Sequence, residues 1–156
     1  RHATLKKILS NQSALIQSFL NSGFSLIMLQ VSVASVVLMI SPKIFSWLGM
    51  NYLQLGVFHY GVLGALFQVL TLFLTIFISY LNYQRGVFYI QWLFLLTNGV
   101  FTWVSLQLGF PYYGYGYFIS TVVTFFYAAV ITERYVQYLP YHTFITTNTS
   151  VQKSKR

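Results

Sequence analysis

The sequence predicts an all-α integral membrane protein that crosses a bilayer four times. Of its 156 residues, 56% are hydrophobic and only 6% are charged, whereas about a quarter of the residues in a soluble domain are charged. Lys43 is the only charged residue between Lys7 and Arg85, and none lies between Arg85 and Glu133. A charge at the bilayer centre costs about 2.5–3.5 kcal/mol on insertion scales, so such long uncharged stretches are typical of membrane spans.

Residues 1–20 precede the first apolar segment and alternate apolar and polar residues at helical spacing, as in ATLKKILSNQSALIQSFL over 3–20. This pattern predicts an amphipathic helix at the membrane interface or the polar lead-in of the first span. Strands are not expected, because the apolar runs exceed the ~9–11 residues of a membrane barrel strand and lack two-residue alternation.

Four spans are predicted within a transmembrane segment over 21–135, each close to the ~20 residues that cross ~30 Å of hydrocarbon. They run over about 22–40, 57–80, 87–108 and 115–132. Pro42 is expected to end the first span, Gly109 with Pro111 the third, and Glu133 with Arg134 the fourth. Residues 136–156 are expected to form a disordered cytoplasmic tail.

Basic residues indicate how the spans are oriented. One side of the predicted topology would carry Arg1, Lys6, Lys7, Arg85, Arg134, Lys153, Lys155 and Arg156, whereas the other would carry only Lys43. The positive-inside rule therefore predicts that both termini are cytoplasmic. The net charge of +8 does not predict nucleic-acid binding, because the basic residues form no stripe along an element.

Catalytic and metal-binding residues are scarce in this composition. The chain has no cysteine, one acid (Glu133) and three scattered histidines. Paired-carboxylate, thiolate and metal chemistry are therefore not expected, nor is a cofactor, and the protein is predicted not to be an enzyme. His59, alone near one end of its span, is expected to be a hydrogen-bonded structural residue.

Polar or small side chains recur along one face of each span, where they would turn away from lipid. Candidates for lining a cavity that takes a polar, uncharged substrate are Gln68, Asn98, Thr102, Ser105, Thr121 and Thr124. Candidates for close helix packing are Gly61, Gly64 and Ala65. Packing between helices is the competing interpretation of every polar position in these stripes.

The densest aromatic cluster is FPYYGYGYF over 110–118. Gly114 and Gly116 would allow a tight turn, and the tyrosines around it are Tyr112, Tyr113, Tyr115 and Tyr117. An external loop anchored at the membrane interface is the favoured interpretation, and a platform on which sugar rings stack is the alternative.

Several phrases in the second to fourth spans resemble a known family. FHYGVLGALFQVLTLFLTIFISYLNYQRG (58–86), SLQLGF (105–110), YYGYGYF (112–118) and LPYHTF (139–144) are together similar to the C-terminal third of the Pel exopolysaccharide transporters, PelG, over about 50–145. The resemblance implies a twelve-helix flippase of the multidrug/oligosaccharidyl-lipid/polysaccharide superfamily in the bacterial inner membrane. Its implied role is to export the Pel polysaccharide for the biofilm matrix, together with other Pel membrane subunits and a cytoplasmic glycosyltransferase.

The chain begins with Arg1 rather than methionine. With the resemblance, this predicts that the four spans are the closing helices of a larger exporter. A non-transporting membrane assembly subunit and a complete four-span transporter remain alternatives. The complete four-span transporter is disfavoured, because small transporters of this kind move hydrophobic cations and need an acid within the membrane. The predicted spans contain no acid.

Overall fold

A computed structural model describes the backbone of residues 2–147 and the side chains of residue 14 and residues 17–137. Its elements are α1 (His2–Trp47), α2 (Tyr52–Tyr80), α3 (Gln84–Leu108), the short 3-10 helix η1 (Phe110–Tyr112) and α4 (Tyr115–Thr147). The described residues contain no strand, and all four α-helices include a stretch long and apolar enough to cross a membrane. The predicted all-α membrane fold with four spans is therefore confirmed.

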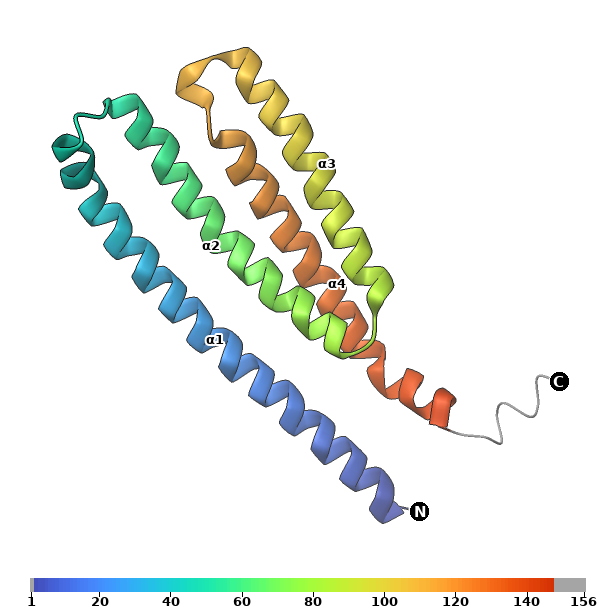
Figure 1. Cartoon of the computed structure of the whole chain (residues 1–156). Helices are drawn as coiled ribbons and strands as arrows, with labels where there is room; N and C mark the ends of the chain where they lie inside the picture. Colours follow the sequence, from blue (N-terminus) through green and yellow to red (C-terminus); the bar gives the residue numbers. More distant parts are fainter. Residues whose placement is uncertain (1, 148–156) are drawn as a thin grey trace.

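The helices lie side by side in the order α1, α2, α4, α3 (Figure 1). The central pair, α2 and α4, packs along its length, α3 packs on α4, and α1 packs on α2. The turn between α2 and α3 lies at the end where α1 begins and α4 finishes, which we call the terminal end. The opposite end carries the α1–α2 connection and η1, and we call it the aromatic end.

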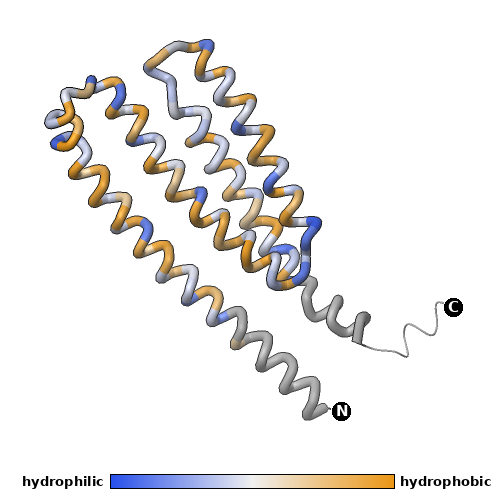
Figure 2. Tube along the Cα trace, viewed as in Figure 1, coloured by the Kyte–Doolittle hydropathy of each residue, from blue (hydrophilic) through white to orange (hydrophobic). Residues whose placement is uncertain are grey.

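Apolar residues run along all four helices, and the most hydrophilic positions include the turn between α2 and α3 (Figure 2). At that turn α2, α3 and α4 converge on a small core of Ile78, Ile90 and Ala128, all fully buried. Tyr83 caps this core, stacking on Tyr135 with ring centroids 4.4 Å apart. The three helices therefore pack tightly against one another at the terminal end.

The prediction that Pro42 ends the first helix is wrong. α1 continues through Pro42 to Trp47, although proline has no N–H to donate to the carbonyl of Leu38. The hydroxyl of Ser41 replaces that donor, because Ser41 Oγ lies 2.9 Å from the carbonyl oxygen of Leu38. Serine side chains re-satisfy freed carbonyls in this way in membrane helices, which is why proline is tolerated there.

The prediction that the fourth helix ends at Glu133 and Arg134 is also wrong. α4 continues to Thr147, through Pro140. The expected disordered tail is therefore helical from 136 to 147, and its remaining residues, 148–156, lie outside the described part of the chain. Charged residues end the apolar stretch but leave the backbone hydrogen bonds of a helix intact, so the span and the helix have different ends.

The other ends differ less from the predictions. α2 begins five residues before its predicted start, after Asn51, whose backbone N–H donates to Gln54 Oε1 over 3.1 Å. α3 begins at Gln84, three residues before its predicted start, and ends at Leu108 as predicted. The lead-in and the first span form one continuous helix, so the structure has no separate helix over 1–20 in its described part.

Candidate functional site at the aromatic end

Buried hydroxyls form a seam between α4 and its two neighbours. Thr121 and Thr124 are fully buried and Ser105 is 7% exposed. Each donates to a backbone carbonyl of its own helix: Thr121 to Phe118, Thr124 to Ser120 and Ser105 to Phe101, over 2.7–2.8 Å. Thr71 and Thr75 do the same in α2. The hydrogens of these hydroxyls are therefore engaged within the helices, and the seam is closely packed rather than water-filled.

Gly64 is the glycine at which α2 and α4 come closest. A Cβ built on Gly64 would lie 2.5 Å from Cε1 of Tyr117 and 3.4 Å from Oγ1 of Thr121. Gly61, one turn earlier, has no atom within 4 Å of such a Cβ, and Ala65 is only half-buried. Of the two glycines predicted to allow close packing, Gly64 makes this contact and Gly61 does not.

Asn98 joins α3 to α4 halfway along the seam. Its Oδ1 accepts a hydrogen bond from Thr102 over 3.2 Å and lies 3.4 Å from Oγ of Ser120, which also donates to the carbonyl of Tyr117. Ser120 is fully buried. Ser120 was not among the residues predicted from the sequence, although its four-residue spacing to Thr124 places both on one helix face. Asn98, Thr102 and Ser120 therefore form one polar cluster.

Gln68 on α2 has the least satisfied polar group of the seam. Its Oε1 is buried and has no hydrogen-bonding partner among the described residues. An orphaned amide oxygen in an apolar setting costs about 1–3 kcal/mol. Gln68 therefore carries an acceptor that a donor from outside the described chain could satisfy.

A hollow of about 230 Å³ opens where the seam reaches the aromatic end. It is lined by Thr102, Ser105, Leu106, Tyr113, Gly114, Gly116 and Tyr117. Four of these are predicted site residues, drawn from α3, α4 and the connection between them. The hollow is smaller than the about 300–1,000 Å³ of a pocket that encloses a drug-sized ligand. It can therefore take one ring or the edge of a longer ligand.

The two glycines of the aromatic motif have different roles. Gly114 has φ +92°, a conformation that favours glycine, and it makes the predicted turn. Gly116 is not part of that turn: it is a buried residue of α4, and a Cβ there would lie 2.5 Å from the backbone nitrogen of Thr102. Gly116 therefore lets α3 and α4 meet backbone to backbone beneath the hollow.

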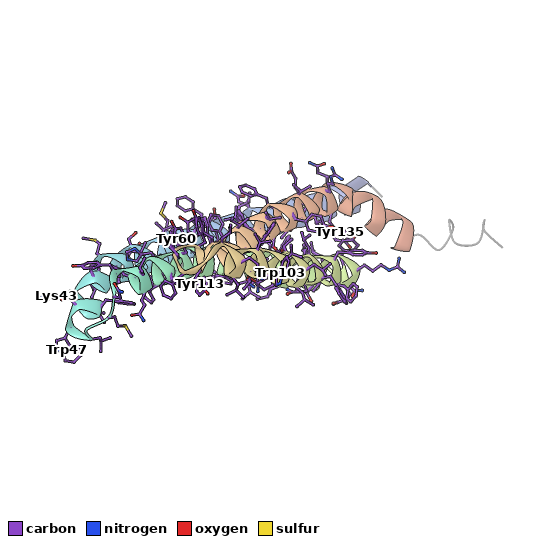
Figure 3. The ribbon with its side chains drawn as sticks, turned by 90° about the horizontal axis from the view of Figure 1, so that it is seen from above. Lys43, Trp47, Tyr60, Trp103, Tyr113 and Tyr135 are labelled. Atoms are coloured by element: carbon purple, nitrogen blue, oxygen red, sulfur yellow. The ribbon has the colours of Figure 1, made fainter. Side chains whose placement is uncertain are left out.

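Several tyrosines gather at the aromatic end, and two of them, Tyr113 and Tyr117, line this hollow. The hydroxyls of Tyr60 and Tyr115 lie 2.5 Å apart, and the ring of Tyr115 also contacts that of Tyr112. Tyr113 lines the hollow and packs on Phe110. Figure 3 shows Tyr60 and Tyr113 toward the end that carries Lys43 and Trp47, far from Tyr135. Aromatic faces next to hydroxyls can pack on apolar surfaces and hydrogen-bond at their edges.

Residues 1–144 match the family described as "PelG: Putative exopolysaccharide Exporter (EPS-E)". The chain belongs to the PelG family. The match extends the resemblance, because the first 50 residues had shown only the family's general character. No curated protein and no solved structure matches the chain.

PelG membership bears on the chemistry available to this chain. The family is an exporter family rather than an enzyme family, and the described residues contain no group of histidines and acids that could hold a metal ion. The one acid, Glu133, is exposed and accepts a hydrogen bond from Gln137 over 3.4 Å. Besides His59, the polar side chains between the charged ends of the spans are amides, hydroxyls, phenols and indoles, which can hydrogen-bond to uncharged polar groups.

Proposed function

We propose that the four helices form the closing part of a polysaccharide exporter in the bacterial inner membrane, which moves the Pel exopolysaccharide across that membrane for the biofilm matrix. The observation that carries this proposal is the hollow bounded by Thr102, Ser105, Tyr113 and Tyr117, in a chain of an exopolysaccharide exporter family. The lining of this hollow is mostly apolar, since the hydroxyls of Thr102 and Ser105 donate within α3. Its aromatic rings suit the flat apolar faces of sugars.

The hollow and the seam would contact one side of the passing polymer. The remaining wall would come from further helices of a twelve-helix flippase with two lobes, in which one lobe rocks against the other. Gln68 and Asn98 are the proposed contacts deeper in the span, and Thr121 and Thr124 support them by packing. The aromatic loop would meet sugar rings where the polymer leaves the membrane.

The proposed orientation follows the distribution of basic residues. Both termini would be cytoplasmic, together with exposed Arg85 and Arg134 at the terminal end. The aromatic end, where Lys43 lies, would face the periplasm. A cytoplasmic glycosyltransferase would then deliver the growing polymer at the terminal end, and other Pel membrane subunits would pack against the uncovered faces of the bundle.

Substitution of the two amides tests the proposal in cells that secrete the polymer with the whole exporter. Asn98→Leu and Gln68→Leu should each lower secreted polymer at least several-fold while the amount of protein in the membrane stays the same. Gln107→Leu is the matched control, because Gln107 is an exposed amide near the end of α3 outside the hollow and the polar cluster. Unchanged secretion in both amide variants would refute a role of these residues in transport.

The second candidate is an assembly subunit that transports nothing. It is favoured by the seam hydroxyls, whose hydrogens are engaged within their own helices. In that case Asn98→Leu should reduce the amount of protein or of its complexes, because an interhelical contact is lost. The secretion lost per molecule of protein in the membrane therefore separates the two functions.

A further inference from the structure

Helix α1 packs mainly on one neighbour, α2, whereas α3 packs on both α4 and α2. Only 6% of the membrane span of α1 is buried within the described chain, as in α3, against 33% for α2. Where α1 passes α2 and α4, an apolar hollow of about 340 Å³ lies between the three helices. It is lined by Phe19, Leu20, Gly23, Phe24, Ile27, Leu70, Phe73, Leu74, Phe125 and Ala129. α1 is therefore held by a few contacts with α2, with space beside them.

Two groups of side chains hold α1 to α2, one toward each end. Toward the terminal end, Phe19 stacks on Phe73 with ring centroids 4.8 Å apart. Toward the aromatic end, Phe45 packs on Phe58 at 5.2 Å. The stacked rings can slide, because apolar contacts have no fixed direction. A directional contact between the helices is made only at Ser41 among the described residues of α1.

Ser41 makes two hydrogen bonds next to Pro42, the residue within α1 that has no backbone N–H to donate. Its Oγ lies 2.9 Å from the carbonyl oxygen of Leu38, which Pro42 leaves unpaired, and 2.8 Å from Nε2 of His59 in α2. The hydroxyl has a single hydrogen. When that hydrogen goes to Leu38, the imidazole Nε2–H must be the donor to Ser41.

This arrangement joins a break in the helix to a bond between helices. Proline weakens a helix locally, because one i→i−4 hydrogen bond is missing and the ring crowds the preceding turn. Ser41 is 2% exposed, so its bond with His59 is shielded from water and lipid. The point at which α1 can bend most easily is thus the point at which it is tied to α2.

We propose that Pro42 is a hinge in α1 and that the Ser41–His59 hydrogen bond is its pin. The long arm of α1, residues 2–38, swings about this pin relative to α2, and the apolar hollow widens or narrows as it does. Lipid can follow the movement, because the hollow is apolar. The hinge is a property of α1 and α2, so it stands whether or not the hollow at the aromatic end contacts polysaccharide.

Spin-label distances measure this movement directly in the full-length protein in lipid. These 156 residues contain no cysteine. Any cysteine elsewhere in the full-length exporter is first replaced by serine, so that labels can be introduced in pairs without a competing thiol. Asn21 with Ile76 reports on the arm, and Ser46 with Leu53 reports on the connected ends, since all four side chains are exposed. The first pair should show a broad distance distribution and the second a narrow one.

His59→Phe removes the pin and keeps the ring volume. We expect the population with the arm separated from α2 to rise about threefold, the change set by one interhelical hydrogen bond in a membrane. His59→Gln should restore the parent distribution, because its amide nitrogen can donate from a similar place. The matched control is Ser32→Ala, whose hydroxyl bonds only to Met28 of its own helix.

Pro42→Ala tests the hinge itself, because alanine supplies the N–H that Leu38 lacks. We expect the arm distribution to narrow. The proposal is overturned if His59→Phe leaves the arm distribution equal to that of Ser32→Ala, or if Pro42→Ala leaves it as broad as in the parent. If His59→Phe does not fold, the arm distance distribution is measured instead in His59→Ala with labels at Asn21 and Ile76. The same two outcomes, together with that of Pro42→Ala, then test the hinge. Secretion of polymer is not the readout, so a failed transport proposal leaves this test intact.

Discussion

The Cα of Gly64 in α2 lies so close to the ring of Tyr117 in α4 that a Cβ there would stand 2.5 Å from Cε1 of the tyrosine. This contact brings the two central helices together just below the aromatic end. It also fixes the Tyr117 ring, which lines the hollow. Helix packing in the middle of the bundle and the shape of the candidate site therefore depend on the same pair of residues.

Gly64→Ala should destabilise the bundle, because the added methyl group forces the Tyr117 ring or the helix to move. Overpacking of this kind costs about 1–3 kcal/mol. Thermal unfolding of the purified protein in detergent would show a lower midpoint. Gly61→Ala is the control, since a Cβ there meets no atom within 4 Å. Equal midpoints for Gly64→Ala and the parent would contradict the described α2–α4 contact.

Gly116→Ala should be more damaging than Gly64→Ala. Its Cβ would lie 2.5–2.6 Å from backbone atoms of Phe101 and Thr102, and backbone cannot turn aside as a tyrosine ring can. We expect α3 and α4 to separate at the aromatic end, with a loss above about 2 kcal/mol. Limited proteolysis of the η1 connection would detect the opening as faster cleavage.

Gly99→Ala is the matched control on α3, because a Cβ there has open space. Replacing a glycine within a helix by alanine is worth about 0.5–1 kcal/mol, so this variant should resist proteolysis at least as well as the parent. If Gly116→Ala behaves like Gly99→Ala, the close backbone approach of α3 and α4 is wrong.

The hydroxyl pair of Tyr60 and Tyr115 should couple α2 to the beginning of α4. Tyr60→Phe and Tyr115→Phe each remove one partner of the 2.5 Å contact while keeping both rings, whose centroids are 4.0 Å apart. A double-mutant cycle on unfolding free energy should give a coupling of about 0.6 kcal/mol, typical of hydrogen bonds in membrane proteins. Strict additivity of the two substitutions would argue against the bond.

Gln68→Leu should leave the unfolding free energy unchanged or raise it. The substitution removes a buried acceptor that has no partner in the described chain, and exchanging such a group for an apolar one of similar size relieves a desolvation cost of about 1–3 kcal/mol. Thermal unfolding in detergent measures this change. A markedly lower midpoint would mean that the amide is satisfied by packing partners, and it would remove Gln68 as a cargo contact.

Asn98→Leu is expected to do the opposite, because Thr102 would lose its acceptor at Oδ1 and the polar contact with Ser120 on α4 would be lost. We expect a loss of about 1 kcal/mol, measured in the same unfolding experiment. Thr97→Val is a suitable control on the same helix, since its hydroxyl bonds only to carbonyls of α3. Asn98 therefore also joins α3 to α4, whereas the Gln68 acceptor has no partner in the described chain.

Hydropathy determined most of the helical content, because the cost of placing charge in a bilayer is a local property of each segment. The four spans, the absence of strands from the described residues and the family were all accessible from composition, spacing and sequence phrases. The helix ends were less accessible. Pro42 was expected to stop α1, but Ser41 supplies the hydrogen bond that proline removes, and no rule for proline alone includes its neighbour's side chain.

The faces of the helices could be predicted, but the residues that meet across them could not. Gly61 and Gly64 are identical residues on one face of α2, yet of the two only Gly64 contacts the ring of Tyr117. Gly116 was expected in a turn and instead lets the backbones of α3 and α4 come close together. Contact depends on the crossing point and rotation of two helices, which a periodic pattern leaves open. Sequence alone therefore determined four membrane helices and their polar stripes. The tertiary structure decided which polar groups are buried between helices and which residues line the hollow.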